Sequence, residues 1–399
     1  MTVRFTPKAV SERVFWVGAV DWERRMFDAL IPLPDGTSYN AYLVRGSEAT
    51  ALVDTVDPPK ADVLLARLES LGISELHYVI ANHAEQDHSG ALPQVLARFA
   101  SAKVVCTEKA KGLLVNLLHL PEERFLTVGD GERLPLGDRT LRFIHAPWVH
   151  WPETMLTYLE QERTLFPCDL FGSHLATSEL FAPDRRALYL AAKRYYAEIM
   201  MPFARTIEKH LAKVEELDPL LIAPSHGPLH SEPRFILDAY REWVSGEPKN
   251  LAAVCYVSMH GSTRALVARL VEALAARGVP CEVFDLQVTD LGKLAMTLVD
   301  AATIVLGAPT VLGGAHPSAV YAAYLANALR PKARFAAVIG SYGWGGHTVE
   351  QLAELLGGLR LELLEPVLVR GLPRPEDEQA IERLAEAIAE RHRGLAPAQ

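Results

Sequence analysis

The sequence contains few cysteines, and no two of them lie close together. Its 399 residues include four, at Cys106, Cys168, Cys255 and Cys281. This spacing excludes a Cys-x-x-Cys zinc, rubredoxin or redox motif, and it does not suggest a disulfide framework. We expect four buried, reduced thiols in a cytoplasmic protein, because disulfides are rare in that compartment.

A block of basic residues is also missing. The formal net charge is -9, and nucleic-acid-binding domains usually carry a clustered positive patch instead. We therefore expect no nucleic-acid partner. Residues 1–12 lack the apolar core of a secretion signal, so they are expected to belong to the mature protein.

One long stretch lacks charge but does not predict a membrane helix. Residues 301–329 contain no Asp, Glu, Lys or Arg and are long enough to span a bilayer. Helix-breaking residues interrupt the middle of this stretch, at Gly307, Pro309, Gly313, Gly314 and Pro317. We expect a strand, a loop and a helix in a soluble core, and no membrane segment.

Length and composition predict two globular domains. Apolar residues make up 49% of the chain and charged residues 22%, enough for ordinary hydrophobic cores. Residues 14–244 mix short strands with helices, including a long mostly helical stretch over 189–217, which favours an αββα sandwich with outer helices. After a polar linker over 245–250, strands and helices alternate, which predicts a doubly wound parallel sheet. The expected α/β domains span residues 1–248 and 251–399.

The polar stretch 82–90 has the composition of a metal site. It follows an apolar run over 77–81 that reads as a buried strand, and it opens into a segment with helical spacing. Four potential ligands lie within six residues, at His83, Glu85, Asp87 and His88. Imidazole suits zinc and iron alike, whereas added carboxylates favour harder ions such as iron or manganese.

Three further strand ends carry potential ligands, at His150, Asp169 and His226. Loops at strand ends are common positions for functional side chains. Four histidines and three carboxylates exceed the needs of one tetrahedral zinc ion and fit two ions that share a carboxylate. Asp169 is the natural bridge because it is alone on its loop.

A second group of strand-end loops lies in the C-terminal half, over 258–263, 307–310 and 340–346. Small hydroxyl residues and glycine before a helix can wrap a phosphate with backbone N–H groups, although the same residues are ordinary helix caps. No Gly-x-Gly-x-x-Gly follows a strand, so a Rossmann NAD or FAD site is not indicated. The candidate cofactor-binding residues are Ser258, Met259, His260, Gly261, Ser262, Thr263, Pro309, Thr310, Ser341, Tyr342, Gly343, Trp344 and Gly345.

The motifs together resemble those of the flavodiiron proteins, a branch of the metallo-β-lactamase superfamily. The resemblance covers nearly the whole chain and depends on His-x-Glu-x-Asp-His at 83–88, on the segments 150–155 and 225–228, and on Asp169-x-Phe171-Gly172-x-His174. It implies one iron held by His83, Glu85 and His150, a second held by Asp87, His88 and His226, and Asp169 as the bridge. The C-terminal loops look like those of a flavodoxin domain that binds FMN.

The resemblance also implies an activity. Dioxygen would be reduced to water, or nitric oxide to nitrous oxide, with FMN passing electrons to the two irons. An external donor (a rubredoxin, a reduced deazaflavin or a flavin/NADH reductase) would supply the electrons, and a head-to-tail homodimer or a dimer of dimers would bring FMN of one subunit beside the irons of the other. Tyr196, with Asp169, is the expected catalytic residue, because Tyr195 and Tyr196 resemble a tyrosine pair near the substrate; simple helix packing is the alternative for this pair. His174 is expected to be structural, and because it recurs in the family motif, a contact with the metal ligands is the alternative.

Three residues depart from the family pattern, and two other functions stay open. Asp28 stands where many members have a pocket histidine, His260 where tyrosine is common, and Leu312 where asparagine is common. The first rival is a hydrolase with two zinc ions that activate water; Glu85 and the flavin loops count against it. The second is an electron carrier or redox sensor with a structural metal site.

Overall fold

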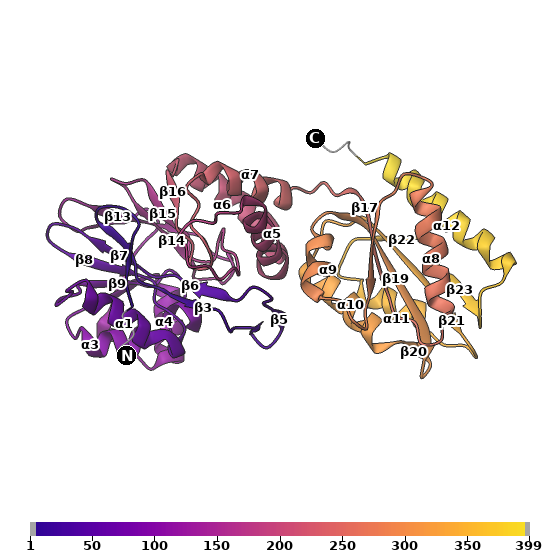
Figure 1. Ribbon diagram of the computed structural model, residues 1–399, viewed down its shortest axis with the longest axis horizontal. Helices are drawn as coiled ribbons and strands as arrows, with labels where there is room; N and C mark the ends of the chain where they lie inside the picture. The colour runs from indigo at the N-terminus through magenta and orange to yellow at the C-terminus, as the bar shows by residue number, and fades with distance from the viewer. Residues whose placement is uncertain (1–4, 396–399) are drawn as a thin grey trace. The chain divides into compact units, whose positions relative to one another are not determined.

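The structure is a computed structural model that describes residues 5–395, and these form two compact units (Figure 1). One unit contains the described residues up to Tyr196 together with Phe203–Val244. The other begins at Ser245 and also takes in the short segment Ala197–Pro202. The chain therefore passes from one unit to the other at the start of the polar stretch that we expected to be a linker.

The first unit is built on two sheets. Its larger sheet has the strand order β1-β2-β7-β8-β9-β10-β11, antiparallel on the β1 side and parallel from β8 onward. These strands are Lys8–Ala9, Val14–Trp16, Tyr42–Arg45, Thr50–Val53, Tyr78–Ile80, Lys103–Cys106 and Phe125–Thr127. The second sheet has the order β12-β13-β14-β15-β16, with strands Arg133–Pro135, Thr140–His145, Met155–Leu159, Thr164–Phe166 and Leu221–Ile222.

Neighbouring residues of the larger sheet enter two different cores because side chains alternate across a strand. Val44, Val53 and Ile80 face the second sheet, where they pack with Phe143 and Phe166. Their immediate neighbours face outward against helices α1 (Ala61–Ser70), α3 (Leu92–Arg98) and α4 (Glu108–Leu118). Helices α5 (Arg185–Tyr195), α6 (Ala204–Leu217) and α7 (Pro233–Val244) lie beside the second sheet (Figure 1). The predicted αββα sandwich is confirmed.

Small elements complete this unit. Two small antiparallel pairs lie between β2 and β7 in the chain. Strand β3 (Ala19–Asp21) pairs with β6 (Thr37–Tyr39), and the hairpin of β4 (Met26–Phe27) and β5 (Ile31–Pro32) lies between them in sequence. Short 3₁₀ turns occupy Pro58–Lys60 and Glu122–Arg124.

Residues 189–217 are helical, as expected, but they do not form one continuous α-helix. Helix α5 ends at Tyr195 and is followed by a π-helical turn over Tyr196–Met200 and a 3₁₀ turn over Met201–Phe203. Pro202 explains the interruption, since proline removes an N–H donor and clashes with the preceding turn of a helix. The mostly helical stretch predicted from the sequence is therefore confirmed, with a local break in its α-helical geometry that hydrophobic periodicity did not reveal.

The second unit is a parallel sheet with the strand order β18-β17-β19-β21-β22, in which β23 also pairs with β21 and β20 pairs with β19. In order of the chain this reads 2-1-3-4-5, the flavodoxin-like arrangement. The strands are β17 (Lys249–Tyr256), β18 (Cys281–Asp285), β19 (Ala301–Val311), β20 (Gly314–Ala315), β21 (Phe335–Tyr342), β22 (Glu362–Leu363) and β23 (Val367–Arg370). The predicted doubly wound sheet is confirmed.

Helices cover both faces of this sheet (Figure 1). Helices α8 (Ser262–Ala275) and α12 (Pro375–Arg393) share one apolar core with the strands. Helices α9 (Leu291–Leu298), α10 (Pro317–Leu329) and α11 (Thr348–Leu355) cover the opposite face of the sheet (Figure 1). The uncharged stretch 301–329 contains strand β19, the short strand β20 that pairs back onto it, and helix α10. It therefore forms a strand, a turn and a helix, as expected.

Among the described residues, no helix has both the length and the apolar character needed to cross a bilayer. The four cysteines are unpaired, three of them buried and Cys281 partly buried.

Candidate metal centre and flavin site

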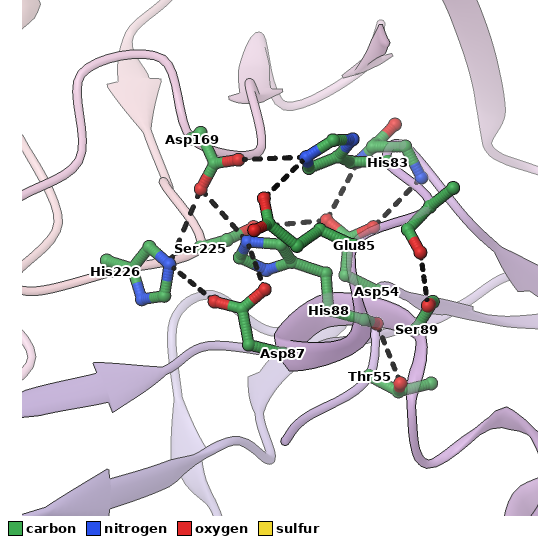
Figure 2. A network of polar contacts seen from close by, with 12 residues as sticks. Asp54, Thr55, His83, Glu85, Asp87, His88, Ser89, Asp169, Ser225 and His226 are labelled. Atoms are coloured by element: carbon green, nitrogen blue, oxygen red, sulfur yellow. Dashed lines mark hydrogen bonds and ion pairs between the residues drawn. The ribbon is translucent and has the colours of Figure 1, made fainter. Parts of the chain in front are cut away.

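Four loops of the first unit bring the seven predicted ligands together. Figure 2 labels six of them, all except His150. His83 and Glu85 follow strand β9, and Asp87 and His88 lie on a one-turn helix, α2 (Gln86–Ser89). The stretch 82–90 is therefore part loop and part helix, where the sequence suggested a loop throughout. The other three ligands follow strands of the second sheet, His150 after β13, Asp169 after β15 and His226 after β16.

Asp169 lies at the centre of the cluster, and its two oxygens face different histidines. Oδ1 is 2.9 Å from Nε2 of His88 and 3.4 Å from Nε2 of His226. Oδ2 is 3.4 Å from Nε2 of His150 and 3.6 Å from Nε2 of His83. A carboxylate that presents one oxygen to each of two imidazole pairs has the geometry of a bridge.

The remaining carboxylates divide the cluster in the same way. Glu85 Oε2 lies 3.1 Å from Nε2 of His83 and 3.2 Å from Nε2 of His150. Asp87 Oδ2 lies 3.1 Å from Nε2 of His226, and its Oδ1 is 3.4 Å from Nε2 of His88. Two groups of ligand atoms result, each within 4.8 Å, one with His83, Glu85, His150 and Asp169 and the other with Asp87, His88 and His226.

Contacts behind two of the histidines turn their Nε2 atoms toward the cluster. Nδ1 of His83 lies 2.6 Å from Glu153 Oε1, and Nδ1 of His226 lies 2.7 Å from the carbonyl oxygen of Ser38. In both cases Nδ1–H donates, which leaves a lone pair on Nε2. Such acceptors behind metal-binding histidines fix the tautomer and the ring orientation.

The electrostatics of the cluster favour a bound cation. Burial acts to lower the pKa of His226, but Asp169 and Asp87 raise it to about 10. Burial likewise opposes protonation of His150, whereas Asp169 and Glu85 raise its pKa to about 9. Carboxylates that hold protons on buried imidazoles this firmly supply the negative charge that stabilises a metal cation.

The poor hydrogen bonding inside the cluster points to the same conclusion. Within the described part of the chain, both carboxylate oxygens of Asp87, Oδ2 of Asp169 and both ring nitrogens of His88 are buried and make no hydrogen bond. All of these atoms except His88 Nδ1 face another charged member of the cluster, at 2.9–3.4 Å. Unpaired buried polar groups are costly, and metal coordination would satisfy those that face the cluster. The seven side chains therefore fit a dinuclear metal centre. Cys168 is also near His88 and Asp169, but burial raises the pKa of its thiol well above the usual value.

The structure brings Tyr195, and not Tyr196, into contact with this cluster. Tyr195 is buried, and its hydroxyl donates to Asp169 Oδ1 at 2.8 Å. The Tyr196 ring packs against Tyr240 and Trp243, and its hydroxyl is buried with no hydrogen-bond partner in the described residues. In the described residues, the Tyr196 side chain contacts none of the predicted ligands, so its expected catalytic role has no support from these contacts.

His174 lies beside the cluster and contacts His226, one of the predicted ligands, which agrees with the alternative to a purely structural role. Its ring centroid is 4.9 Å from that of His226. Nδ1 of His174 lies 2.8 Å from Thr37 Oγ1, which is itself 3.5 Å from Nδ1 of His226. Burial lowers the pKa of His174 well below its usual range, and the charge of His226 adds to this effect. A neutral His174 thus supports the His226 side of the cluster.

An open hollow of about 260 Å³ leads to the cluster. Glu85 and Asp87 line it together with Arg24, Phe27 and Asp28. Asp28 lies in the turn between β4 and β5, where its φ is 49°. Burial raises the pKa of Asp28, and the charges of Glu85 and Asp87 raise it further. The departure noted at position 28 therefore places an acidic side chain at the entrance to the ligands.

Sequence reasoning missed two residues that organise the site. Asp54 is buried and accepts hydrogen bonds from the backbone N–H of Asn82 at 2.9 Å and from the hydroxyl of Ser225 at 3.1 Å. It thereby joins the segments just before His83 and His226. Its position directly after the apolar strand β8 is the signal that could have revealed it. Glu153 lies in the segment 150–155, where the sequence did not indicate its contact with His83.

In the second unit, the candidate flavin residues lie at the carboxyl ends of β17, β19 and β21. Ser258 Oγ accepts from the N–H of Gly261, at 3.2 Å, and Gly261 has φ 91°, so the backbone turns sharply before α8. Thr263 is buried, with Oγ1 3.5 Å from Ser341 Oγ. These strands adjoin in the sheet, and flavodoxin-like sheets bind FMN at the switch point between the first and third strands, here β17 and β19.

Two of the predicted loops begin later than expected. Pro309 and Thr310 belong to β19, which extends to Val311, and Ser341 and Tyr342 belong to β21. Past the strand ends, the large apolar side chains are exposed, with Trp344 86% and Leu312 fully accessible. The backbone N–H groups near the strand ends can bind a phosphate. The exposed apolar side chains can pack against a planar ring, so the residues fit a flavin.

Comparison with known proteins agrees with this architecture. The model of the ODP family beta lactamase matches residues 37–227, a range that includes all seven predicted ligands. A nitric oxide reductase from Moorella thermoacetica is 37% identical over 397 residues, which cover 96% of this chain and 98% of that protein.

Solved structures match over both units. A rubredoxin oxygen:oxidoreductase from Desulfovibrio gigas has a TM-score of 0.93 at 29% identity, and the match covers 97% of this chain and 98% of the other. The flavodiiron protein from Giardia intestinalis has a TM-score of 0.90 at 27% identity and covers 98% of each chain. Fold and site thus define an oxidoreductase that joins a metallo-β-lactamase-like domain to a flavodoxin-like domain. The chain belongs to the flavodiiron protein family.

Proposed function

We propose that this protein reduces dioxygen to water, nitric oxide to nitrous oxide, or both, at two iron ions that receive electrons through FMN. The observation that carries the proposal is the split of the cluster around Asp169, with one carboxylate oxygen directed at each histidine pair. Two irons and one reduced flavin would together supply the several electrons that these reductions need.

The donor set favours iron over zinc. Each proposed ion has a carboxylate of its own, Glu85 in one group and Asp87 in the other, in addition to Asp169. That gives three carboxylates for two ions, and carboxylate-rich histidine sites suit iron better than tetrahedral zinc. We propose His83, Glu85 and His150 as ligands of one iron, Asp87, His88 and His226 as ligands of the other, and Asp169 as their bridge.

The protein's own groups have defined tasks in this scheme. Glu153 and the Ser38 carbonyl hold His83 and His226 in the tautomer that presents Nε2. The hollow beside Glu85 and Asp87 admits a small gas. In the flavin domain, which we propose spans residues 251–399, the backbone before α8 would bind the FMN phosphate at the helix N-terminus, and Thr263 would add a hydroxyl.

We further propose that copies of the chain pair head to tail. In the metallo-β-lactamase-like domain, proposed to span residues 1–248, Trp22, Met26 and Leu30 near the hollow are 54%, 44% and 56% exposed. In the flavin domain, Leu312 and Trp344 are exposed beside the proposed FMN site. Burying such apolar surface against another copy would be favourable. A monomer with full activity in solution would contradict this arrangement.

The test measures metal, flavin and gas consumption on one purified sample. We expect two irons and one FMN per chain, and turnover of dioxygen or nitric oxide with a chemically reduced donor; the ratio of the two rates ranks the substrates. Stoichiometric zinc with esterase or lactamase turnover would support a hydrolase instead. Reversible flavin reduction without gas consumption would support an electron carrier. Rates with a rubredoxin, a reduced deazaflavin and an NADH-dependent flavin reductase would identify the class of donor.

A further inference from the structure

The two oxygens of Asp169 differ in their hydrogen bonding. Oδ1 accepts the hydroxyl hydrogen of Tyr195 at 2.8 Å, besides facing His88 and His226. Oδ2 faces His83 and His150 and accepts no hydrogen bond from the described residues. The hydroxyl of Tyr195 therefore binds only Oδ1, the oxygen that faces His88 and His226, and leaves Oδ2 to face His83 and His150.

Tyr195 is held firmly in this position. It is buried, and its ring centroid lies 4.8 Å from that of His174 and 5.8 Å from that of His226. It is the last residue of α5, at the point where the helix changes to a π-helical turn. Single π-helical turns in α-helices occur frequently at functional sites.

We propose that Tyr195 is a positioning residue that keeps Asp169 in the bridging orientation between the two metal positions. The inference rests on the two-ion function proposed above. The last torsion of an aspartate side chain is broad, so a free carboxylate could rotate and give both oxygens to one ion. A hydrogen bond from a fixed, buried donor to one oxygen opposes that rotation, and hydrogen bonds to charged acceptors are about twice as strong as neutral ones.

The consequence falls mainly on the second ion to bind. With Tyr195 present, the first ion takes one oxygen of Asp169 and the other oxygen stays directed at the second position. Without the hydroxyl, the first ion can take both oxygens. The second position then keeps its three other ligands, Asp87, His88 and His226 in one group or His83, Glu85 and His150 in the other, but loses the shared one.

The test is a titration of the metal-free protein with Co²⁺, a spectroscopic probe that needs no turnover. Tyr195→Phe removes only the hydroxyl and keeps the ring, so the packing against His174 is preserved. We expect the first ion to bind within threefold of wild type and the second to bind about 10–100-fold more weakly, the usual cost of losing a contact to a metal ligand. Magnetic coupling between the two Co²⁺ ions should weaken when excess metal fills both positions.

Tyr196→Phe is the matched control, because it removes the neighbouring hydroxyl, which contacts no predicted ligand. It should bind both ions with wild-type affinity and coupling. Tyr195→Phe with wild-type affinity for both ions would overturn the proposal, as would equal weakening of both, since a general structural role predicts the latter. A wild-type protein that binds a single Co²⁺ ion would overturn the two-ion function itself, and the inference with it.

Discussion

Replacing Asp169 by asparagine should reduce the metal content from two ions to one per chain. The side chain is buried between four imidazole Nε2 atoms at 2.9–3.6 Å, so asparagine keeps its volume and removes its charge. Two unit charges 4 Å apart interact by about 4 kcal/mol at an effective dielectric constant of 20. Two divalent cations at roughly the 3.5–4 Å separation of two-metal sites therefore repel each other by about 16 kcal/mol.

In the proposed centre, the carboxylate of Asp169 would offset this repulsion. One negative charge attracts a dication about 4 Å away by about 8 kcal/mol on the same scale, and a coordinating carboxylate lies closer, so the two attractions together at least equal the repulsion between the ions. A neutral asparagine removes the attraction to both ions, so their mutual repulsion is no longer offset. One ion can still bind to three remaining ligands, whereas the second meets the full repulsion of the first.

The assay combines metal analysis of the purified variant with titration of the metal-free form. Asp57→Asn is the charge-matched control, because Asp57 lines the same hollow but contributes no atom to either ligand group. It should retain two ions. If Asp169→Asn retained two ions with wild-type affinity and full turnover, Asp169 would not be the bridge and the charge balance described here would be wrong.

Three further outcomes test other parts of the molecule. Thr263→Ala should weaken FMN binding by about 1.5–3 kcal/mol, the value of a hydrogen bond to a charged group, in a titration of the flavin-free protein. Gly227→Ala should lower the melting temperature and the metal content, because φ is +74° and a Cβ there would lie 2.1 Å from Ser173 Oγ, beside His226. His392 is buried and its pKa is lowered by burial to about 4, so the native state resists a proton that the unfolded chain accepts below about pH 6.5. The free energy of unfolding should therefore fall between about pH 6.5 and 4, by at most about 3 kcal/mol; urea denaturation of His392→Gln should lack this component.

Strand ends were the most informative feature of the sequence. Apolar runs that stop at His83, Asp169 and His226 indicated side chains that could meet at one edge, and the structure brings those residues together. The prediction worked because hydrophobic runs mark strands reliably, and because strands of two packed sheets can end at a common edge. This prediction did not depend on which strands pair with one another in the sheets.

The tyrosine pair shows where sequence reasoning fails. Tyr195 and Tyr196 are adjacent, and successive residues of a helix point about 100° apart, so only one of them can face Asp169. Which one does so depends on the register of α5 and on the π-helical turn that follows it. Neither the position of that turn nor its effect on Tyr195 follows from hydrophobic periodicity.

Asp54 explains how ligands from two different sheets keep a common geometry. It follows β8 in the larger sheet, and it accepts the backbone N–H and the side-chain amide of Asn82, at 2.9 and 3.0 Å, and the hydroxyl of Ser225, at 3.1 Å. Burial raises the pKa of this carboxyl, while His88 and the three hydrogen bonds act to lower it.

A buried carboxyl is costly unless it is fully hydrogen-bonded, so the contacts of Asp54 are mutually dependent. If either the loop before His83 or the loop before His226 moved away, Asp54 would lose a partner in a region that water does not reach. The cost of that loss holds the two loops in register across the sandwich. The proposed ligands His83 and His226 are therefore held in place by a buried polar network around Asp54, which the fold itself supplies.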